Sequence, residues 1–205
     1  MSHPTIRTLA GATPPQSLAP ATTALLVIDF QEEYFSGRLP IPDGLRALRN
    51  ARRLIDHADQ AGMAVIHVQH VLPAGSPLFE DGASAAFHPE LQPGAGHTVV
   101  SKTAVSAFPG TDLDRRLKAA GIDTVVIAGL MTHACVAGAA RDAVPLGYQV
   151  IVAEDACATR DLDTRHGVVP HAELHRATLA ALADTFGDIT VSYTHLRAHE
   201  TREDL

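Results

Sequence analysis

The chain has 205 residues, enough for one domain that buries its own core without metal or disulfide crosslinks. A hydrophobic content of 46% argues against wholesale disorder, and a formal net charge of −7 argues against nucleic acid as a partner. Only two cysteines are present, so we expect no disulfide framework and a cytoplasmic location. No stretch approaches the ~20 apolar residues of a membrane span, so we expect no membrane partner.

Residues 1–23 are interrupted by prolines and lack a long apolar run, which favours an irregular arm over a signal peptide. Residues 72–96 form a Pro/Gly-rich loop, for which a lid and a contact with another subunit both remain open. Helices are predicted from apolar residues three or four positions apart, at 43–60, 111–120, 133–146 and 166–186. Strands are predicted from short apolar runs, at 24–29, 64–70, 98–102, 124–128, 149–153 and 188–192.

This alternation of strands and helices predicts an α/β fold of three layers, with helices on both faces of a mainly parallel sheet. No internal repeat or second boundary is visible, so residues 24–192 are expected to form one domain. Residues 193–205 lack apolar periodicity and resemble translated adapter sequence, so we expect a non-native or disordered tail.

Cys135 stands where the strand 124–128 and its following glycine give way to a predicted helix. Unpaired amide N–H groups and the positive end of the helix dipole at such a place favour an anion, so the thiol is expected to tend towards thiolate. The alternative is a buried cysteine that acts as a small hydrophobic residue. Cys157 has no matched base nearby and is expected to be structural.

Two further polar residues end predicted strands. Asp29 closes the first strand and Lys102 closes the third. Each has an ordinary alternative, since Asp29 could cap a turn and Lys102 could be solvated. In open parallel sheets, however, ligands bind at the carboxyl ends of strands. We therefore expect Asp29, Lys102 and Cys135 to meet at one edge of the sheet.

At this point the chain resembles the isochorismatase-like cysteine hydrolases, over roughly residues 20–192. The resemblance implies a six-stranded, Rossmann-like parallel sheet of order 3-2-1-4-5-6 and a catalytic triad at Asp29, Lys102 and Cys135. It implies no nucleotide cofactor, because the glycine fingerprint is absent after the first strand. The matching segments are Leu-Leu-Val-Ile-Asp-Phe-Gln (25–31), Ser-Lys-Thr-Ala-Val-Ser-Ala-Phe (101–108), Gly-Leu-Met-Thr-His-Ala-Cys-Val (129–136) and Glu-Asp-Ala-Cys-Ala-Thr (154–159).

The resemblance also implies a reaction. Asp29 would take the thiol proton as Cys135 attacks a carbonyl, and Lys102 would hold Asp29 and favour the thiolate. Backbone N–H groups of Met131 and Cys135 would bind the oxyanion, beside a cis peptide at Leu130–Met131. The expected activity is metal-independent cleavage of a C–N bond in a small amide, ureido or carbamoyl compound, through an acyl-cysteine intermediate.

Strand order raises a geometric difficulty for this triad. In the order 3-2-1-4, the strand that carries Lys102 lies two strand spacings, about 10 Å, from the strand that carries Asp29. The lysine side chain and the sheet twist must close this distance. A lysine amine far from Asp29 and Cys135 would contradict the triad.

A metal site is not expected. Nicotinamidases resemble this family but add an Asp-x-His motif after the first strand, and the matching residues 39–45 contain no histidine. His67, His70 and His88 are scattered, and we interpret them as core or surface residues rather than ligands.

Substrate contacts are predicted for Gln31, Phe35, Phe108 and Thr132, although the aromatic residues could equally belong to the core. A homo-oligomer, dimer or tetramer, is expected from the family. Two other functions remain open: vinyl ether hydrolysis of the isochorismatase type, and a non-enzymatic redox sensor that uses Cys135 as a reactive thiol.

Overall fold

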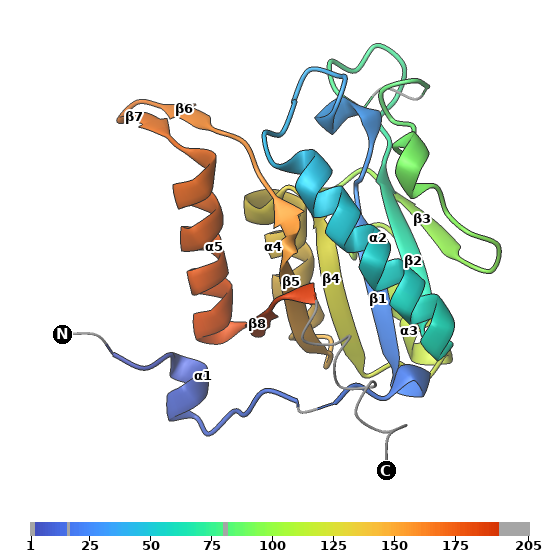
Figure 1. Cartoon of the computed structure of the whole chain (residues 1–205), viewed down its shortest axis with the longest axis vertical. Helices are drawn as coiled ribbons and strands as arrows, with labels where there is room; N and C mark the ends of the chain where they lie inside the picture. Colours follow the sequence, from blue (N-terminus) through green and yellow to red (C-terminus); the bar gives the residue numbers. More distant parts are fainter. Residues whose placement is uncertain (1–2, 16, 80–81, 193–205) are drawn as a thin grey trace.

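The computed structural model describes residues 3–15, 17–79 and 82–192. Its centre is a parallel sheet of order β3-β2-β1-β4-β5-β8 (Figure 1). This confirms the expected order, because the sixth strand is numbered β8 only after a separate hairpin, β6–β7. The strands of the sheet are β1 (Thr23–Ile28), β2 (Ala64–His70), β3 (Thr98–Lys102), β4 (Thr124–Leu130), β5 (Gln149–Ala158) and β8 (Asp188–Thr190).

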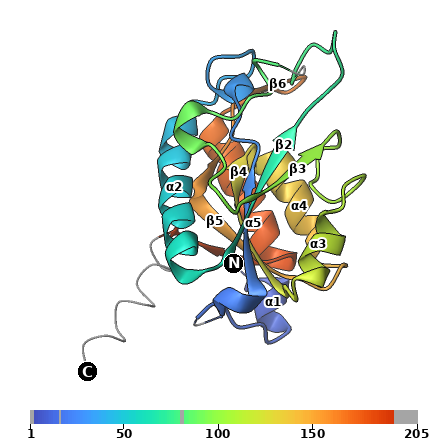
Figure 2. The same ribbon diagram turned by 90° about the vertical axis from the view of Figure 1, so that its right-hand side faces the viewer.

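Helices cover both faces of the sheet, which confirms the three-layer prediction. Helix α2 packs on one face, and α3, α4 and α5 pack on the other, where their apolar residues form a second core cluster. Figure 2 shows the sheet between α2 on one side and α3 and α4 on the other. The helices are α2 (Gly44–Ala61), α3 (Leu113–Ala119), α4 (Ala137–Ala143) and α5 (His171–Thr185).

The two cores follow from the two periods in the sequence. Along β1, Leu25 and Val27 face α2, whereas Leu26 and Ile28 face the opposite helices, because successive strand residues point to opposite faces. Gly62 ends α2 in the left-handed conformation with φ 69°, which a glycine adopts without steric cost. The buried residues of α2 recur three or four positions apart: Ala47, Leu48, Ala51, Leu54, Ile55 and Ala58.

Three elements differ from the sequence prediction. The last helix begins at His171 rather than 166, because β6 (Leu162–Thr164) and β7 (Gly167–Val169) form an antiparallel hairpin before it. Strand β5 continues to Ala158, since its pairing with β4 shifts register after Ile127 and then resumes. The helix predicted from 133 begins instead as a π-helical turn, Thr132–Val136.

The N-terminal arm contains one helical turn, α1 (Ile6–Leu9), and a 3-10 turn, Pro20–Thr22. Arg7 Nη2 lies 2.8 Å from Asp188 Oδ2, so the arm contacts the edge strand β8. The tail predicted at 193–205 lies outside the described residues. Within the described part of the chain, no helix is both long and apolar enough to cross a membrane.

Candidate active site

Asp29, Lys102 and Cys135 meet at the carboxyl edge of the sheet. Lys102 Nζ lies 2.8 Å from Asp29 Oδ2 and 3.5 Å from Cys135 Sγ. The three residues are 0%, 2% and 3% exposed, so the contacts form in a nearly dry environment. The expected convergence is therefore present, and the Lys102 side chain spans the distance that the strand order left open.

Local backbone structure orients Asp29. The residue follows β1 with φ 56°, a conformation that Asp adopts more readily than most residues. Its N–H donates to Val68 O and its C=O accepts from Gln31 N–H, so the chain turns sharply at the end of the strand. This turn directs the carboxylate towards Lys102.

Cys135 lies within the π-helical turn that follows β4. The peptide Leu130–Met131 before this turn is cis, as the family resemblance implies. The N–H groups of Ala134 and Val136 both donate to Met131 O, which closes the turn around the sulfur-bearing residue. Cys135 thus stands between the end of a strand and the start of α4, as the sequence pattern predicts.

The charge balance at the sulfur differs from the expectation of a resting thiolate. Burial and then the nearby Asp29 carboxylate raise the pKa of Cys135 to about 12, and the opposing effect of Lys102 is smaller. Burial also raises the pKa of Asp29, despite the ion pair with Lys102. The resting site therefore keeps the proton on sulfur, with Asp29 nearby to receive it.

His70 is a site residue that the sequence analysis assigned to core or surface. Its Nδ1 lies 3.1 Å from Lys102 Nζ, and ligand atoms of Asp29, His70 and Cys135 all lie within 4.8 Å of one another. Within the described residues this is the group of side chains whose chemistry could hold a metal ion. The Lys102 ammonium already contacts all three, so a cation is in place among them.

The strand register explains the contact of His70 with Lys102. His70 and Lys102 are partners on the parallel strands β2 and β3, so both side chains leave the sheet on the same face. The sequence analysis did not predict Tyr34 as a site residue either. Its pKa is raised first by burial and then by Cys135 and Asp29, which places its hydroxyl beside the triad.

Gln31 and Thr132, two of the predicted substrate contacts, already use their polar groups within the protein. Gln31 Nε2 donates to His70 O and Ala85 O, both at 2.7 Å, and its Oε1 accepts from His70 N–H at 2.7 Å. Thr132 Oγ1 is buried and lies 2.8 Å from His175 Nδ1. Their positions favour shaping of the site over direct contact with a substrate.

The two aromatic residues predicted to contact substrate, Phe35 and Phe108, lie in different surroundings. Phe35 is half-buried and packs against His88, with ring centroids 4.4 Å apart. Phe108 packs in the core cluster below α3 and stacks on Tyr148 at 6.0 Å, so its ring belongs to the core, the alternative left open for it. Phe79, from the loop 72–96, instead stacks on His70 at 4.7 Å and contacts Tyr34 edge-on at 5.2 Å. Part of that loop therefore covers the site.

Arg160 adds a cation next to this edge of the sheet. It follows Thr159, whose hydroxyl lies 2.6 Å from His133 Nδ1, and its charge affects the pKa of both His133 and Tyr34. The Arg160 Nε is buried and has no hydrogen-bond partner among the described residues. The guanidinium therefore retains a donor beside the turn that carries Cys135.

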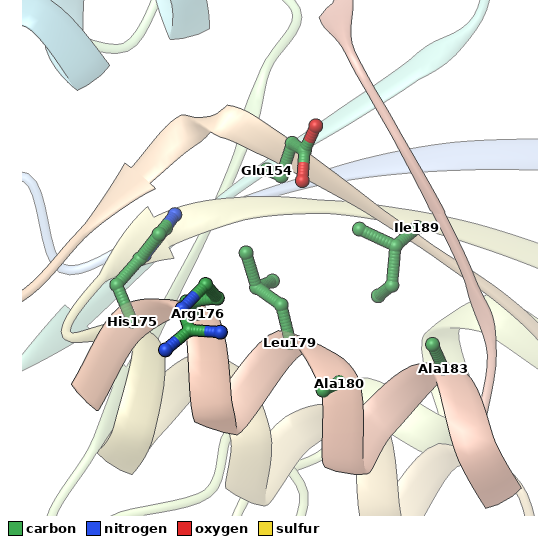
Figure 3. Close-up of a pocket in the computed structure, with 7 residues that line it drawn as sticks. All are labelled: Glu154, His175, Arg176, Leu179, Ala180, Ala183 and Ile189. Atoms are coloured by element: carbon green, nitrogen blue, oxygen red, sulfur yellow. The ribbon is translucent and has the colours of Figure 1, made fainter. Parts of the chain in front are cut away.

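A separate pocket of about 320 Å³ lies between α5 and the edge strand β8 (Figure 3). His175 is one of its lining residues and also bonds Thr132, so the pocket is connected with the turn of Cys135. The triad residues do not line it. The lining residues are Glu154, His175, Arg176, Leu179, Ala180, Ala183 and Ile189.

The family model described as the isochorismatase domain matches residues 23–192. The chain belongs to the isochorismatase family. Isochorismatase-family hydrolases are thus its relatives in sequence as well as in fold, and the likeness extends over nearly the whole described domain.

Three relatives illustrate how similar this isochorismatase-family protein is to known proteins in sequence and in structure. An isochorismatase of Pseudomonas putida KT2440 has a crystal structure that superposes with a TM-score of 0.88 and 34% identity, covering 94% of this chain and 99% of that one. The uncharacterised family protein YddQ of Bacillus subtilis is 34% identical, covering 86% and 99%. The maleamate amidohydrolase of Pseudomonas putida is 32% identical, covering 81% of each chain.

The two buried histidines of β2 predict how stability depends on pH. Burial lowers the pKa of His67 and His70 to about 4. Below pH 6.5 these two histidines therefore bind protons in the unfolded chain but stay neutral in the folded chain until the pH approaches 4. Stability should therefore fall as pH drops from about 6.5 towards 4. Urea unfolding across that range should show a flatter decline in a His67→Asn/His70→Asn variant, and an equally steep decline would contradict the assignment.

Proposed function

We propose that this isochorismatase-family protein hydrolyses the C–N bond of a small amide, ureido or carbamoyl compound through an acyl-Cys135 intermediate. The observation that carries the proposal is the buried Lys102 ammonium, which contacts both the Asp29 carboxylate and the Cys135 sulfur. A carboxylate, a cation and a thiol in one dry site provide a base, a fixed charge and a nucleophile.

Acylation follows from these positions. Asp29 takes the proton from the thiol while Cys135 Sγ attacks the carbonyl carbon, and the carbonyl oxygen becomes an oxyanion. Backbone N–H groups of Met131 and Cys135 bind that oxyanion, an effect of about 3–4 kcal/mol per donor in other hydrolases. The proton then passes from Asp29 to the departing nitrogen, the C–N bond breaks and a thioester remains.

Deacylation uses the same groups in reverse. Asp29 takes a proton from a water molecule, whose oxygen attacks the thioester carbon. The carboxylic acid leaves, and the proton on Asp29 returns to the Cys135 sulfur. Lys102 stays charged throughout and balances the negative charge as it moves between Asp29 and Cys135. No step requires a metal or a cofactor.

Arg160 favours substrates that carry an acidic group. Its buried Nε has no hydrogen-bond partner in the part of the chain that the structure describes, and it lies next to the turn of Cys135. Maleamate, named for one relative, is an amide with a carboxylate. We expect Arg160→Met to raise the KM for maleamate about tenfold or more, with a smaller effect on an uncharged amide. Steady-state kinetics with both amides tests this, and equal effects on the two would contradict a carboxylate contact.

The direct test is mass spectrometry of the intact protein mixed with small carboxamides, beginning with maleamate. The proposal expects an acyl group on Cys135 and release of ammonia. Ammonia release without any adduct, and unaltered by alkylation of Cys135, would overturn the covalent mechanism. Vinyl ether hydrolysis remains the second candidate, since the closely superposing Pseudomonas putida protein is described as an isochorismatase.

The redox-sensor alternative is disfavoured by the state of the sulfur. Cys135 is 3% exposed and its pKa is raised to about 12, whereas sensor cysteines are accessible and have a low pKa. Peroxide should therefore oxidise Cys135 slowly. Rapid formation of a sulfenic acid, together with no turnover of any amide, would favour the sensor.

A further inference from the structure

His70 contacts the Lys102 amine in a way that the reaction above does not use. His70 Nδ1 lies 3.1 Å from Lys102 Nζ, and the two residues are 9% and 2% exposed. They are register partners at the last positions of β2 and β3, so the contact follows directly from sheet pairing. A buried ammonium and a buried imidazole at this distance constrain each other strongly.

The His70 ring has a fixed position. Gln31 binds both backbone polar groups of His70, accepting from its N–H and donating to its C=O, each at 2.7 Å. Phe79 lies parallel to the ring, with 2° between the planes and 4.7 Å between the centroids. Nδ1 is therefore held towards Lys102 by contacts on the backbone and on the ring face.

The ring is also in a fixed protonation state near neutral pH. Burial and the charge of Lys102 lower the pKa of His70 to about 4, so the imidazole is neutral. An ammonium can only donate, so Nδ1 must be the acceptor and the proton must lie on Nε2. Lys102 thus has a neutral acceptor in His70 Nδ1.

The number of donors on Lys102 makes this acceptor important. An ammonium has three hydrogens, and three acceptors lie within 3.1 Å of Nζ: Asp29 Oδ2, Ala104 O and His70 Nδ1. These three contacts leave Nζ 3.5 Å from Cys135 Sγ. The position of the charge relative to the sulfur is therefore set by three fixed acceptors, of which His70 is the one side chain without charge.

We infer that His70 is a positioning residue that holds the Lys102 ammonium, charged and in place, between Asp29 and Cys135. The inference rests on the proposed role of these residues in hydrolysis. Without the Nδ1 acceptor, a ring carbon would face the ammonium, which disfavours its charged form and frees its position. The Cys135 thiolate would then form less readily. The titratable or charged groups that face this site are Asp29 from β1, Tyr34 from the turn after it, His70 from β2 and Cys135 from the π-helical turn.

The test compares two substitutions of His70. His70→Phe keeps a ring to stack on Phe79 but removes the nitrogen, whereas His70→Asn retains an acceptor close to the position of Nδ1. The probe is iodoacetamide, and the readout is the rate of Cys135 alkylation from about pH 6 to 10. We expect His70→Phe to slow alkylation about tenfold and to shift the profile upward by about one pH unit. His70→Asn should remain within about threefold of the wild type.

His67 provides the matched control. It is another buried histidine of β2 with a pKa lowered to about 4, but its Nε2 pairs with His97 Nδ1 at 3.1 Å and contacts no triad residue. His67→Phe should leave the alkylation profile unchanged. An unchanged or faster rate in His70→Phe would overturn the inference, as would an equal loss in His70→Asn.

Phe79→Leu gives an independent route if His70→Phe fails to fold. This change leaves the nitrogen in place but removes the ring that orients it, so alkylation should slow by about threefold. A wild-type profile in Phe79→Leu together with a slow one in His70→Asn would contradict positioning. Alkylation needs no substrate, so these outcomes stand apart from the proposed hydrolysis. Absence of amide turnover in the wild type would contradict that function alone.

Discussion

Cys135→Ala is expected to abolish amide turnover, with a loss in kcat of about 10⁴-fold or more. The physical reason is that alanine cannot form the thioester, and the backbone N–H groups alone provide only the residual stabilisation of an oxyanion. Ammonia release in the steady state measures the loss, and intact-protein mass spectrometry checks that no acyl group accumulates.

Cys157→Ala is the control for this substitution. Cys157 is also buried, and its sulfur lies 3.9 Å from Ile127 O, in the second half of the β4–β5 pairing. Its loss removes about the same volume as Cys135→Ala without touching the triad. We expect activity within a few-fold of the wild type. Vinyl ether hydrolysis that survives in Cys135→Ala would favour the isochorismatase-type reaction, because that chemistry needs no nucleophilic sulfur, whereas surviving amide turnover would contradict the acyl-cysteine mechanism.

Lys102→Met is expected to lower both activity and stability. Removing one partner of a buried ion pair leaves an uncompensated charge, and such changes cost about 3–5 kcal/mol. The Asp29–Lys102 pair has 0% side-chain exposure on both sides, so water cannot replace the lost ammonium. In the folded variant Asp29 is therefore protonated and can no longer accept the thiol proton. We expect kcat to fall about 10³-fold or more.

The double variant Asp29→Asn/Lys102→Met separates the two effects. It replaces the ion pair by neutral groups of similar size, so it should regain much of the stability that Lys102→Met loses. It should not regain activity, since both the base and the cation are absent. Urea unfolding and ammonia release on the same preparations give both quantities. A double variant less stable than either single variant would show that the pair does not act as a coupled unit.

The sequence pattern was sufficient for the layers of the sheet and for the convergence of Asp29, Lys102 and Cys135 at its edge. Asp29, Lys102 and Cys135 each follow an apolar run, and in a parallel sheet all such run ends lie at the same edge. The strand order came from the family resemblance, and the observed pairing of β3 with β2 and of β2 with β1 agrees with it. The cis peptide at Leu130–Met131 likewise came from resemblance and is present.

Sequence pattern alone did not show which side chains lie around Asp29, Lys102 and Cys135. Phe108 lies six residues after Lys102, yet its ring packs into the core cluster that includes Leu113 and Leu117 of α3 and stacks on Tyr148. Phe79 lies in an irregular loop with no periodicity, and only the path of that loop brings it onto His70. Side chains in loops have no fixed period, so their direction cannot be read from spacing.

The amino-acid sequence by itself determined the layers and the meeting of an acid, an amine and a thiol at one edge of the sheet, because these depend on local hydrophobic period and on chain order. Only the tertiary structure decided that His70 bonds Lys102, since that contact depends on the register between two strands 32 residues apart. The tertiary structure also decided that the thiol rests protonated. The pKa of Cys135 is raised by burial and by Asp29, and both act through space rather than along the chain.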